Sequence, residues 1–139
     1  MAKPLQLQEL WNELYSRKGI GWLTVCSGSM SPMIQIGDSI LVKYVTSKQI
    51  HLGDIVVFKE MDRLVTHRII GRQIGNHRIT FLQKGDSNTF ASELFAENVI
   101  GKVICIEKKD KFMKLDSFWG SLMNRFLGIC FHLLYVLLG

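Results

Sequence analysis

Short strand-like segments fill most of residues 34–107, and they constrain the fold more than any other feature. They are rich in β-branched and aromatic residues, which favour strands. Gly-Asp and Gly-Asn pairs typical of turns separate them. The expected strands are residues 22–25, 39–45, 54–59, 64–70, 77–82 and 98–106. Because no helical periodicity interrupts them, the sequence predicts a mainly β domain over residues 21–107, coiled or barrel-like in form.

Helical periodicity is expected at the N-terminal end, in residues 1–20. Apolar residues recur at helical spacing from Leu7 to Tyr15, with polar residues on the other side. Pro4 suits the start of a helix and Gly19 suits its end. These features predict an amphipathic helix over residues 5–18, too polar for a signal peptide or a membrane anchor.

The C-terminal segment, residues 108–139, combines a basic start with a long apolar stretch. Small and polar residues lie along one helical stripe and apolar residues along the other. The uninterrupted apolar part is expected to be shorter than the ~20 residues that a spanning helix needs. A helix lying in the membrane interface is one interpretation. A helix that packs on the β domain or forms a dimer contact is the other. The basic residues are Lys108, Lys109, Lys111 and Lys114.

Composition narrows the class of partner. The formal net charge is +5 and the mean hydropathy is +0.16, which favours an anionic surface. The lysines cluster beside the apolar tail and no stacking aromatic motif occurs, so we expect a membrane surface and no nucleic acid. Three well-separated cysteines give no disulfide framework and are expected to be buried. The histidines lack metal-ligand spacing, and no metal or cofactor is expected. The residues concerned are Cys26, Cys105, Cys130, His51, His77 and His132.

A bent, hydroxyl-rich segment at residues 26–33 contains the candidate nucleophile, Ser29. A serine nucleophile needs an exposed hydroxyl, a base within hydrogen-bond reach and donors for the oxyanion. Gly28 permits close backbone approach. The Ser29 amide and the Ser27 hydroxyl could both face a developing oxyanion. Considered alone, Ser-Gly-Ser is most often just a loop.

The order of four motifs strengthens this reading. Together they span the β-rich part from Val25 to Ile106, and their succession resembles the signal peptidase I family, within the larger group that includes LexA-type self-cleaving repressors. The motifs are GSMSP at 28–32, GDIVVF at 53–58, THRII at 66–70 and KGDSN at 84–88. The resemblance implies the coiled signal-peptidase-like β fold.

The resemblance also implies roles for individual residues. Ser29 matches the catalytic serine and Ser27 the residue whose hydroxyl assists the oxyanion hole. His67 stands where common bacterial members carry a lysine base, which resembles the endoplasmic-reticulum, archaeal and sporulation-type branch. A histidine has an ordinary pKa near 6.5 and serves readily as a base near neutrality. Asp86 is the candidate acid beside it.

Two points stay open at this stage. The further aspartate that eukaryotic-type members carry after the last motif is missing from residues 87–93, so either Asp86 takes that role or the site is a Ser–His dyad. Met30 and Met33 are candidates to line a substrate cleft, although methionine is also a common core residue.

The function implied is a serine endopeptidase of the signal peptidase type. It would cleave a precursor or signal peptide after small residues, using Ser29 and His67, and would be membrane-associated. One alternative is a self-cleaving LexA-type domain, although the Ala-Gly or Cys-Gly bond that such proteins cut is absent and their base is a lysine. The other is a non-catalytic β domain that binds peptides or a membrane.

Overall fold

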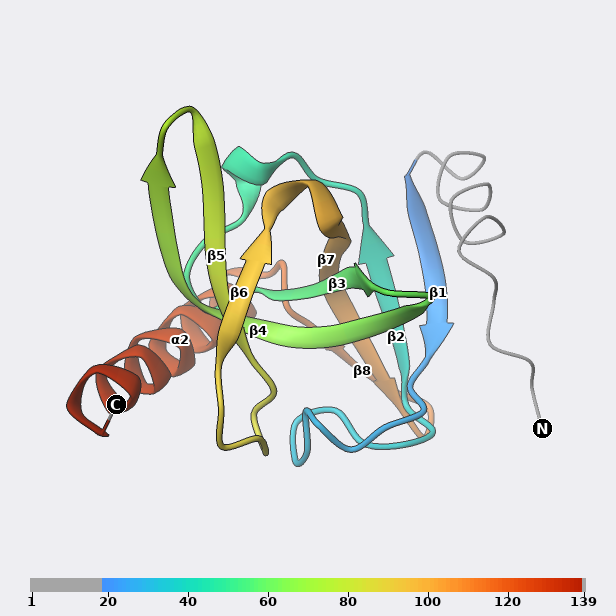
Figure 1. The fold of residues 1–139 in the computed structure, drawn as a ribbon. Coiled ribbons are helices and arrows are strands. Elements are labelled where there is room, and N and C mark those ends of the chain that lie inside the picture. Colours follow the sequence, from blue (N-terminus) through green and yellow to red (C-terminus); the bar gives the residue numbers. More distant parts are fainter. Residues whose placement is uncertain (1–18, 139) are drawn as a thin grey trace.

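A strongly coiled antiparallel sheet and one long helix make up residues 19–138, the part that the computed structural model describes (Figure 1). Two short 3-10 turns, η1 (Ser47–Gln49) and η2 (Ala96–Asn98), and the helix α2 (Phe118–Leu138) complete it. The strands are β1 (Ile20–Thr24), β2 (Ser39–Lys43), β3 (Ile55–Glu60), β4 (Arg63–Gly75), β5 (Arg78–Lys84), β6 (Ser92–Phe95), β7 (Val99–Lys108) and β8 (Lys111–Lys114).

The strand order is β1-β2-β7-β3-β4-β5-β6, and β8 pairs with β7. All pairs are antiparallel. This confirms the predicted mainly β, coiled fold with an apolar C-terminal helix. The helix expected over residues 5–18 lies outside the described residues.

Strand β4 is the longest, with 13 residues, and it turns the sheet around itself. Its first half, from Arg63 to Arg68, pairs with β3. Its second half, from Arg68 onward, pairs with β5. The expected segment 64–70 captured only the part of β4 before Gly71. Strands β6 and β8 were not expected at all, because both are short and their sequences are polar or charged.

The sheet buries one apolar cluster on each face. Successive side chains of a strand point to opposite faces, so Ile55 and Val57 enter the first cluster while Val56 and Phe58 enter the second. His67 and Arg68 are consecutive and therefore also face opposite sides. The first cluster contains Met30, Ile34, Ile40, Val42, Ile55, Val57, Val103, Ile106 and Leu115; the second contains Ile50, Val56, Phe58, Ile69, Phe81 and Leu94.

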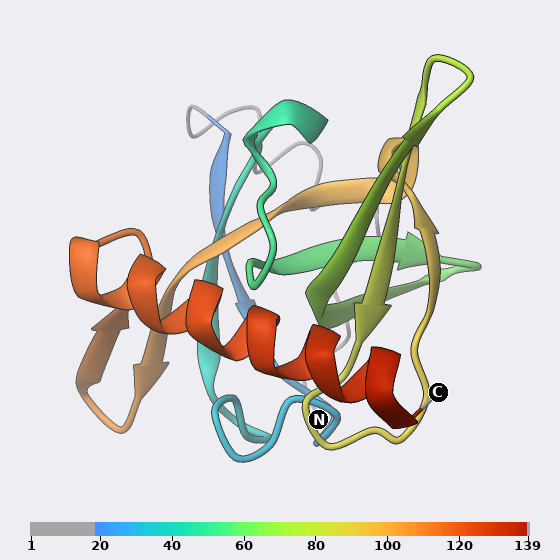
Figure 2. The same cartoon turned by 90° about the vertical axis from the view of Figure 1, so that its left-hand side faces the viewer.

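Helix α2 lies across the outside of the sheet, as Figure 2 shows. It turns its small and polar stripe toward the strands: Gly120, Asn124 and Gly128 are buried, and His132 Nδ1 lies 2.8 Å from the carbonyl oxygen of Ile70. The apolar stripe faces outward. Its exposed members are Leu122, Phe126, Ile129, Leu133, Leu134, Tyr135, Val136, Leu137 and Leu138.

The length expected for the apolar part of this helix was wrong. Residues Gly120–Leu138 form 19 continuous helical residues with a mean hydropathy of 1.5, long and apolar enough to cross a membrane by length and composition alone. Of the polar side chains within it, Asn124 and His132 contact the strands, whereas Arg125 is exposed.

Candidate active site

The loop between β1 and β2 presents Ser29. Backbone hydrogen bonds close its base, from Val25 N to Asp38 O (2.8 Å) and from Gly37 N to Val25 O (2.9 Å). Inside the loop, Ser31 N donates to Gly28 O at 3.0 Å. Ser27 is exposed and Ser29 is half-buried. The loop is therefore fixed at its base and open at the serines.

A second segment, the turn after β5, holds the serine loop in place. Ser87 donates twice to it, from its amide to Ser29 O (3.0 Å) and from its hydroxyl to Gly28 O (2.8 Å). A Cβ at Gly85 would lie closer than 3.0 Å to Ser29 O, so only glycine permits this approach. The loops at 25–38 and 85–91 lie at the same end of the molecule in Figures 1 and 2.

Asp86 is bound to Arg68. Arg68 Nε and Nη2 donate to the two carboxylate oxygens of Asp86, both at 2.8 Å. Arg68 is fully buried, and the Asp86 side chain is 7% exposed. This bidentate ion pair locks the turn whose next residue, Ser87, holds the serine loop.

His67 is bound to Gln83. The imidazole Nδ1 lies 2.6 Å from Gln83 Oε1, and Gln83 Nε2 donates to Ser92 Oγ at 2.8 Å. An amide oxygen only accepts, so Nδ1 carries the proton and Nε2 keeps a free lone pair. Phe58 packs against the imidazole edge to face, with ring centroids 5.8 Å apart.

Burial lowers the pKa of His67 below its ordinary value, because the charged imidazolium loses hydration. The hydrogen bond to Gln83 and the charges of Glu60 and Asp86 act in the opposite direction and are outweighed. His67 is therefore neutral at pH 7, which is the form that a general base needs.

Among the sequence-predicted residues, the structure brings Ser29 and Asp86 onto adjoining loops, and His67 onto the neighbouring strand. Within residues 19–138, no hydrogen bond links the Ser29 hydroxyl to His67, nor His67 to Asp86. The partner of Nδ1 is Gln83 instead. Sequence reasoning missed Gln83 because an uncharged amide inside a strand gives no motif signal. The strand register reveals its role: Gln83 pairs with Ile69, which lies on the same face of β4 as His67.

The sequence left two roles open for the methionines, a substrate cleft or the core, and the structure shows core packing. Met30 is only 2% exposed, belongs to the first core cluster and accepts the Asp86 amide at 3.4 Å, so it packs rather than lines a cleft. Met33 is half-buried beside the same cluster, and its sulfur lies 3.1 Å from Arg68 Nη2.

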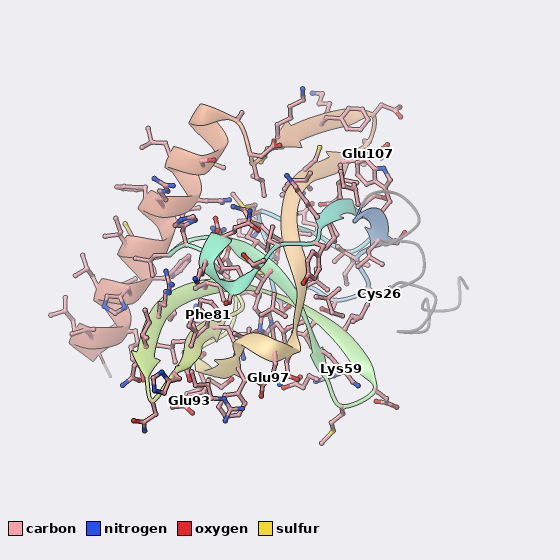
Figure 3. All side chains as sticks on the ribbon, turned by 90° about the horizontal axis from the view of Figure 1, so that it is seen from above. Cys26, Lys59, Phe81, Glu93, Glu97 and Glu107 are labelled. Atoms are coloured by element: carbon pink, nitrogen blue, oxygen red, sulfur yellow. The ribbon has the colours of Figure 1, made fainter. Side chains whose placement is uncertain are left out.

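A pocket of about 380 Å³ lies beside the two residues that contact the His67 imidazole. Both neighbours of the imidazole, Phe58 and Gln83, line it. Lys59 and Glu93, which are labelled in Figure 3, also border it. Phe58 and Gln83 thus separate His67, which does not itself line the pocket, from this open space.

The cysteines are free, but their burial was only partly as expected. Cys105 is buried and Cys130 half-buried, whereas Cys26, just before the serines, is exposed (Figure 3). Burial raises the pKa of the Cys105 thiol. No cluster of three or more metal-ligating side chains occurs within the described residues.

Comparisons with known proteins agree with this architecture. Residues 3–104 match the family described as peptidase S24-like. The chain is also 39% identical over 70 residues to signal peptidase I W of Bacillus subtilis (strain 168). That alignment covers 49% of this chain but only 37% of the relative's length. Since the family match covers well over half of the chain, this protein belongs to the peptidase S24-like family.

Proposed function

We propose that this protein is a serine endopeptidase of the signal peptidase type, with Ser29 as nucleophile and His67 as general base. The observation that carries the proposal is a loop that presents Ser29 next to the strand of His67, a half-buried histidine whose Nδ1 is held by Gln83 and whose pKa is lowered by burial. The relative named signal peptidase I W supports a signal peptide or precursor as the substrate class, and cleavage after small residues is what the resemblance to the signal peptidase family implies.

The proposed reaction has two halves. His67 Nε2 takes the Ser29 hydroxyl proton as Oγ attacks the scissile carbonyl, and the imidazolium then protonates the leaving amine. The Ser29 amide and the Ser27 hydroxyl stabilise the oxyanion; neither donates a hydrogen bond within the described part of the chain. Water activated by His67 then hydrolyses the acyl-enzyme and frees the acid product and Ser29.

An extended peptide has a free strand edge to pair with. Residues 63–67 of β4 pair with β3 on one side, while β5 pairs only from Arg68 onward. Among the strands of residues 19–138, β1 pairs with β2 alone. Leu23 of β1 and Leu64 of β4 pack against the same residue, Ile100, so the two unpaired edges are neighbours. A substrate strand added there runs toward Ser29 and His67.

Substitution of the two reacting residues tests the chemistry. A synthetic signal-peptide-like substrate with alanine before the cut is incubated with each variant, and fragments are quantified by mass spectrometry. Ser29→Ala and His67→Ala are each expected to lower kcat/KM by about 10⁴-fold or more. Ser47→Ala and His77→Ala, placed on η1 and the β4–β5 hairpin, serve as matched controls. Cleavage at the wild-type rate by Ser29→Ala would leave a peptide-binding, non-catalytic domain as the better reading.

We further propose that α2 lies on a membrane surface. In a water-soluble protein an amphipathic helix turns its apolar stripe inward. Here the small and polar stripe faces the sheet, and the apolar stripe, with Phe126 at 64% and Leu133 at 53% exposure, faces outward. The exposed Lys109, Lys111 and Lys114 precede the helix and complement anionic headgroups. Contacts with the sheet as far as His132 favour a helix lying flat over one that crosses.

Co-sedimentation with vesicles tests this surface. Binding to phosphatidylcholine vesicles is expected to rise when phosphatidylglycerol is added, and to weaken with salt. The double variant Phe126→Ser/Leu133→Ser is expected to lower partitioning at least about tenfold. Ile74→Ser, at a residue 69% exposed on β4, is the control. If the double variant instead dissociates a dimer and vesicle binding is unaffected, the outward stripe is a self-association surface and not a lipid-binding one.

A further inference from the structure

We infer that Asn124 of α2 is a positioning residue for Ser29, and that it acts through Arg68 and Asp86. Helix α2 is then part of the scaffold of the active site as well as a peripheral attachment. The inference rests on the proposed role of Ser29 as nucleophile.

Hydrogen bonds connect Asn124 to Asp86 through Arg68, and the next residue along the chain, Ser87, hydrogen-bonds to the serine loop. Asn124 Oδ1 accepts from Arg68 Nη1 at 3.0 Å. Arg68 in turn holds both oxygens of Asp86 at 2.8 Å. The residue after Asp86 is Ser87, which donates to the carbonyl oxygens of Ser29 and Gly28. Three polar residues therefore separate the helix from the serine loop.

Arg68 has no spare donor. Nη1 also donates to Gly53 O at 2.9 Å, and Nη2 also donates to Met33 Sδ at 3.1 Å. With Asn124 and the two bonds to Asp86, these contacts use all five N–H groups of a guanidinium. Arg68 and Asn124 are 0% and 2% exposed, so water does not replace a lost partner without rearrangement. Loss of the Asn124 oxygen therefore strains the orientation of the guanidinium that fixes Asp86.

A second contact joins the helix to the same turn. The Lys84 ammonium lies 4.7 Å from the centroid of the Phe131 ring of α2 and donates to Gly85 O at 3.1 Å. Close backbone packing keeps the helix at this distance, because a Cβ at Gly53 would lie closer than 3.0 Å to the Asn124 backbone. The turn at residues 84–87 is thus linked to α2 twice: through the contact of Lys84 with Phe131, and through the Arg68 bridge between Asp86 and Asn124.

The test compares two substitutions of one residue in the full-length chain. Asn124→Leu removes the acceptor at similar volume and is expected to lower kcat about 10- to 100-fold, with KM changed less than about twofold, because the loss is one of alignment. Asn124→Asp keeps an oxygen at the same place, within reach of Arg68, and is expected to restore kcat to within about threefold of wild type. Gln73→Leu, an exposed amide on β4, is the control for the chemical change.

Amide hydrogen exchange gives a readout that does not need activity. In Asn124→Leu the amides of Ser87 and Ser31, which bond to the serine loop, are expected to exchange at least about tenfold faster, while those of the β1–β2 ladder stay unchanged. If the wild-type protein does not cleave the peptide substrate, the proposed function is overturned. The exchange comparison at Ser87 and Ser31 still tests whether Asn124 holds the serine loop. Unchanged exchange at Ser87 and Ser31, or equal kcat losses in Asn124→Leu and Asn124→Asp, overturns the positioning role.

Discussion

In the proposed mechanism, the protonation state of the His67 imidazole sets the pH range of activity. Burial holds the pKa of His67 below its ordinary value, and Gln83 contributes a neutral acceptor instead of a charge. A base must be unprotonated to act, so a lowered pKa extends activity toward acid. The same burial means that stability falls as the pH drops through the ordinary histidine range, because the unfolded chain takes up the proton first.

Replacing Gln83 by glutamate tests this arrangement. A carboxylate next to Nδ1 favours the imidazolium, so Gln83→Glu is expected to raise the pKa of His67. The acid limb of the kcat/KM–pH profile then moves to higher pH, and activity near pH 6 falls. Gln73→Glu, remote on β4, is the matched charge control. An acid limb that does not move in Gln83→Glu would show that Gln83 is not the partner of His67 in solution.

Individual site residues differ in how far the sequence predicts them. Ser29, His67 and Asp86 stand in motifs whose order is informative, and two of the three lie on the adjoining loops at one end of the sheet. Gln83 stands in no motif, since its role comes from the pairing of β4 with β5. The partner of Asp86 was also missed: Arg68 follows His67 directly in the same motif, and strand alternation sends it to the opposite face, where it binds Asp86.

At the scale of elements, the docking of α2 depends on two glycines. A Cβ at Gly128 would lie closer than 3.0 Å to the backbone of Gly53, which itself has a φ of +94°. Gly128→Ala is therefore expected to destabilise the fold by about 1–3 kcal/mol, although alanine is the better helix former. Urea unfolding measures the difference. Gly75→Ala, where nothing lies within 4 Å and φ is not positive, is the control and is expected to be nearly neutral. Equal stabilities for the two variants would contradict the close packing.

The elements themselves were predictable where local sequence determines them. β-Branched runs gave the longer strands, because side-chain shape and turn residues act over a few positions. The short strands β6 and β8 follow from pairing with β5 and β7, which no local pattern encodes. The orientation of α2 was likewise beyond the sequence, since both of its stripes are compatible with packing, and only Asn124 and the buried glycines select the polar one.

At the scale of the whole molecule, the site and the outward stripe of α2 have a defined relation. The loops at 25–38 and 85–91 lie at one end of the sheet, and α2 runs past that end (Figure 2). In the proposed arrangement, a membrane that buries the exposed side chains from Leu122 to Leu138 passes near the end of the sheet that presents Ser29. Substrates with an apolar segment embedded in that membrane are confined near its surface, which raises their effective concentration at the site.

This relation predicts a kinetic difference between two substrates that carry the same cleavage sequence. With phosphatidylglycerol-containing vesicles, kcat/KM for a peptide bearing an apolar membrane-inserting segment is expected to exceed that of a soluble peptide by about 10²-fold, within the range that confinement supplies. Without vesicles the two rates converge. Phe126→Ser/Leu133→Ser is expected to lose the vesicle-dependent gain, whereas Ile74→Ser keeps it. Equal rates for the two peptides, on vesicles that bind the enzyme, would mean that α2 holds the site away from the bilayer. The membrane would then attach the enzyme without selecting its substrates.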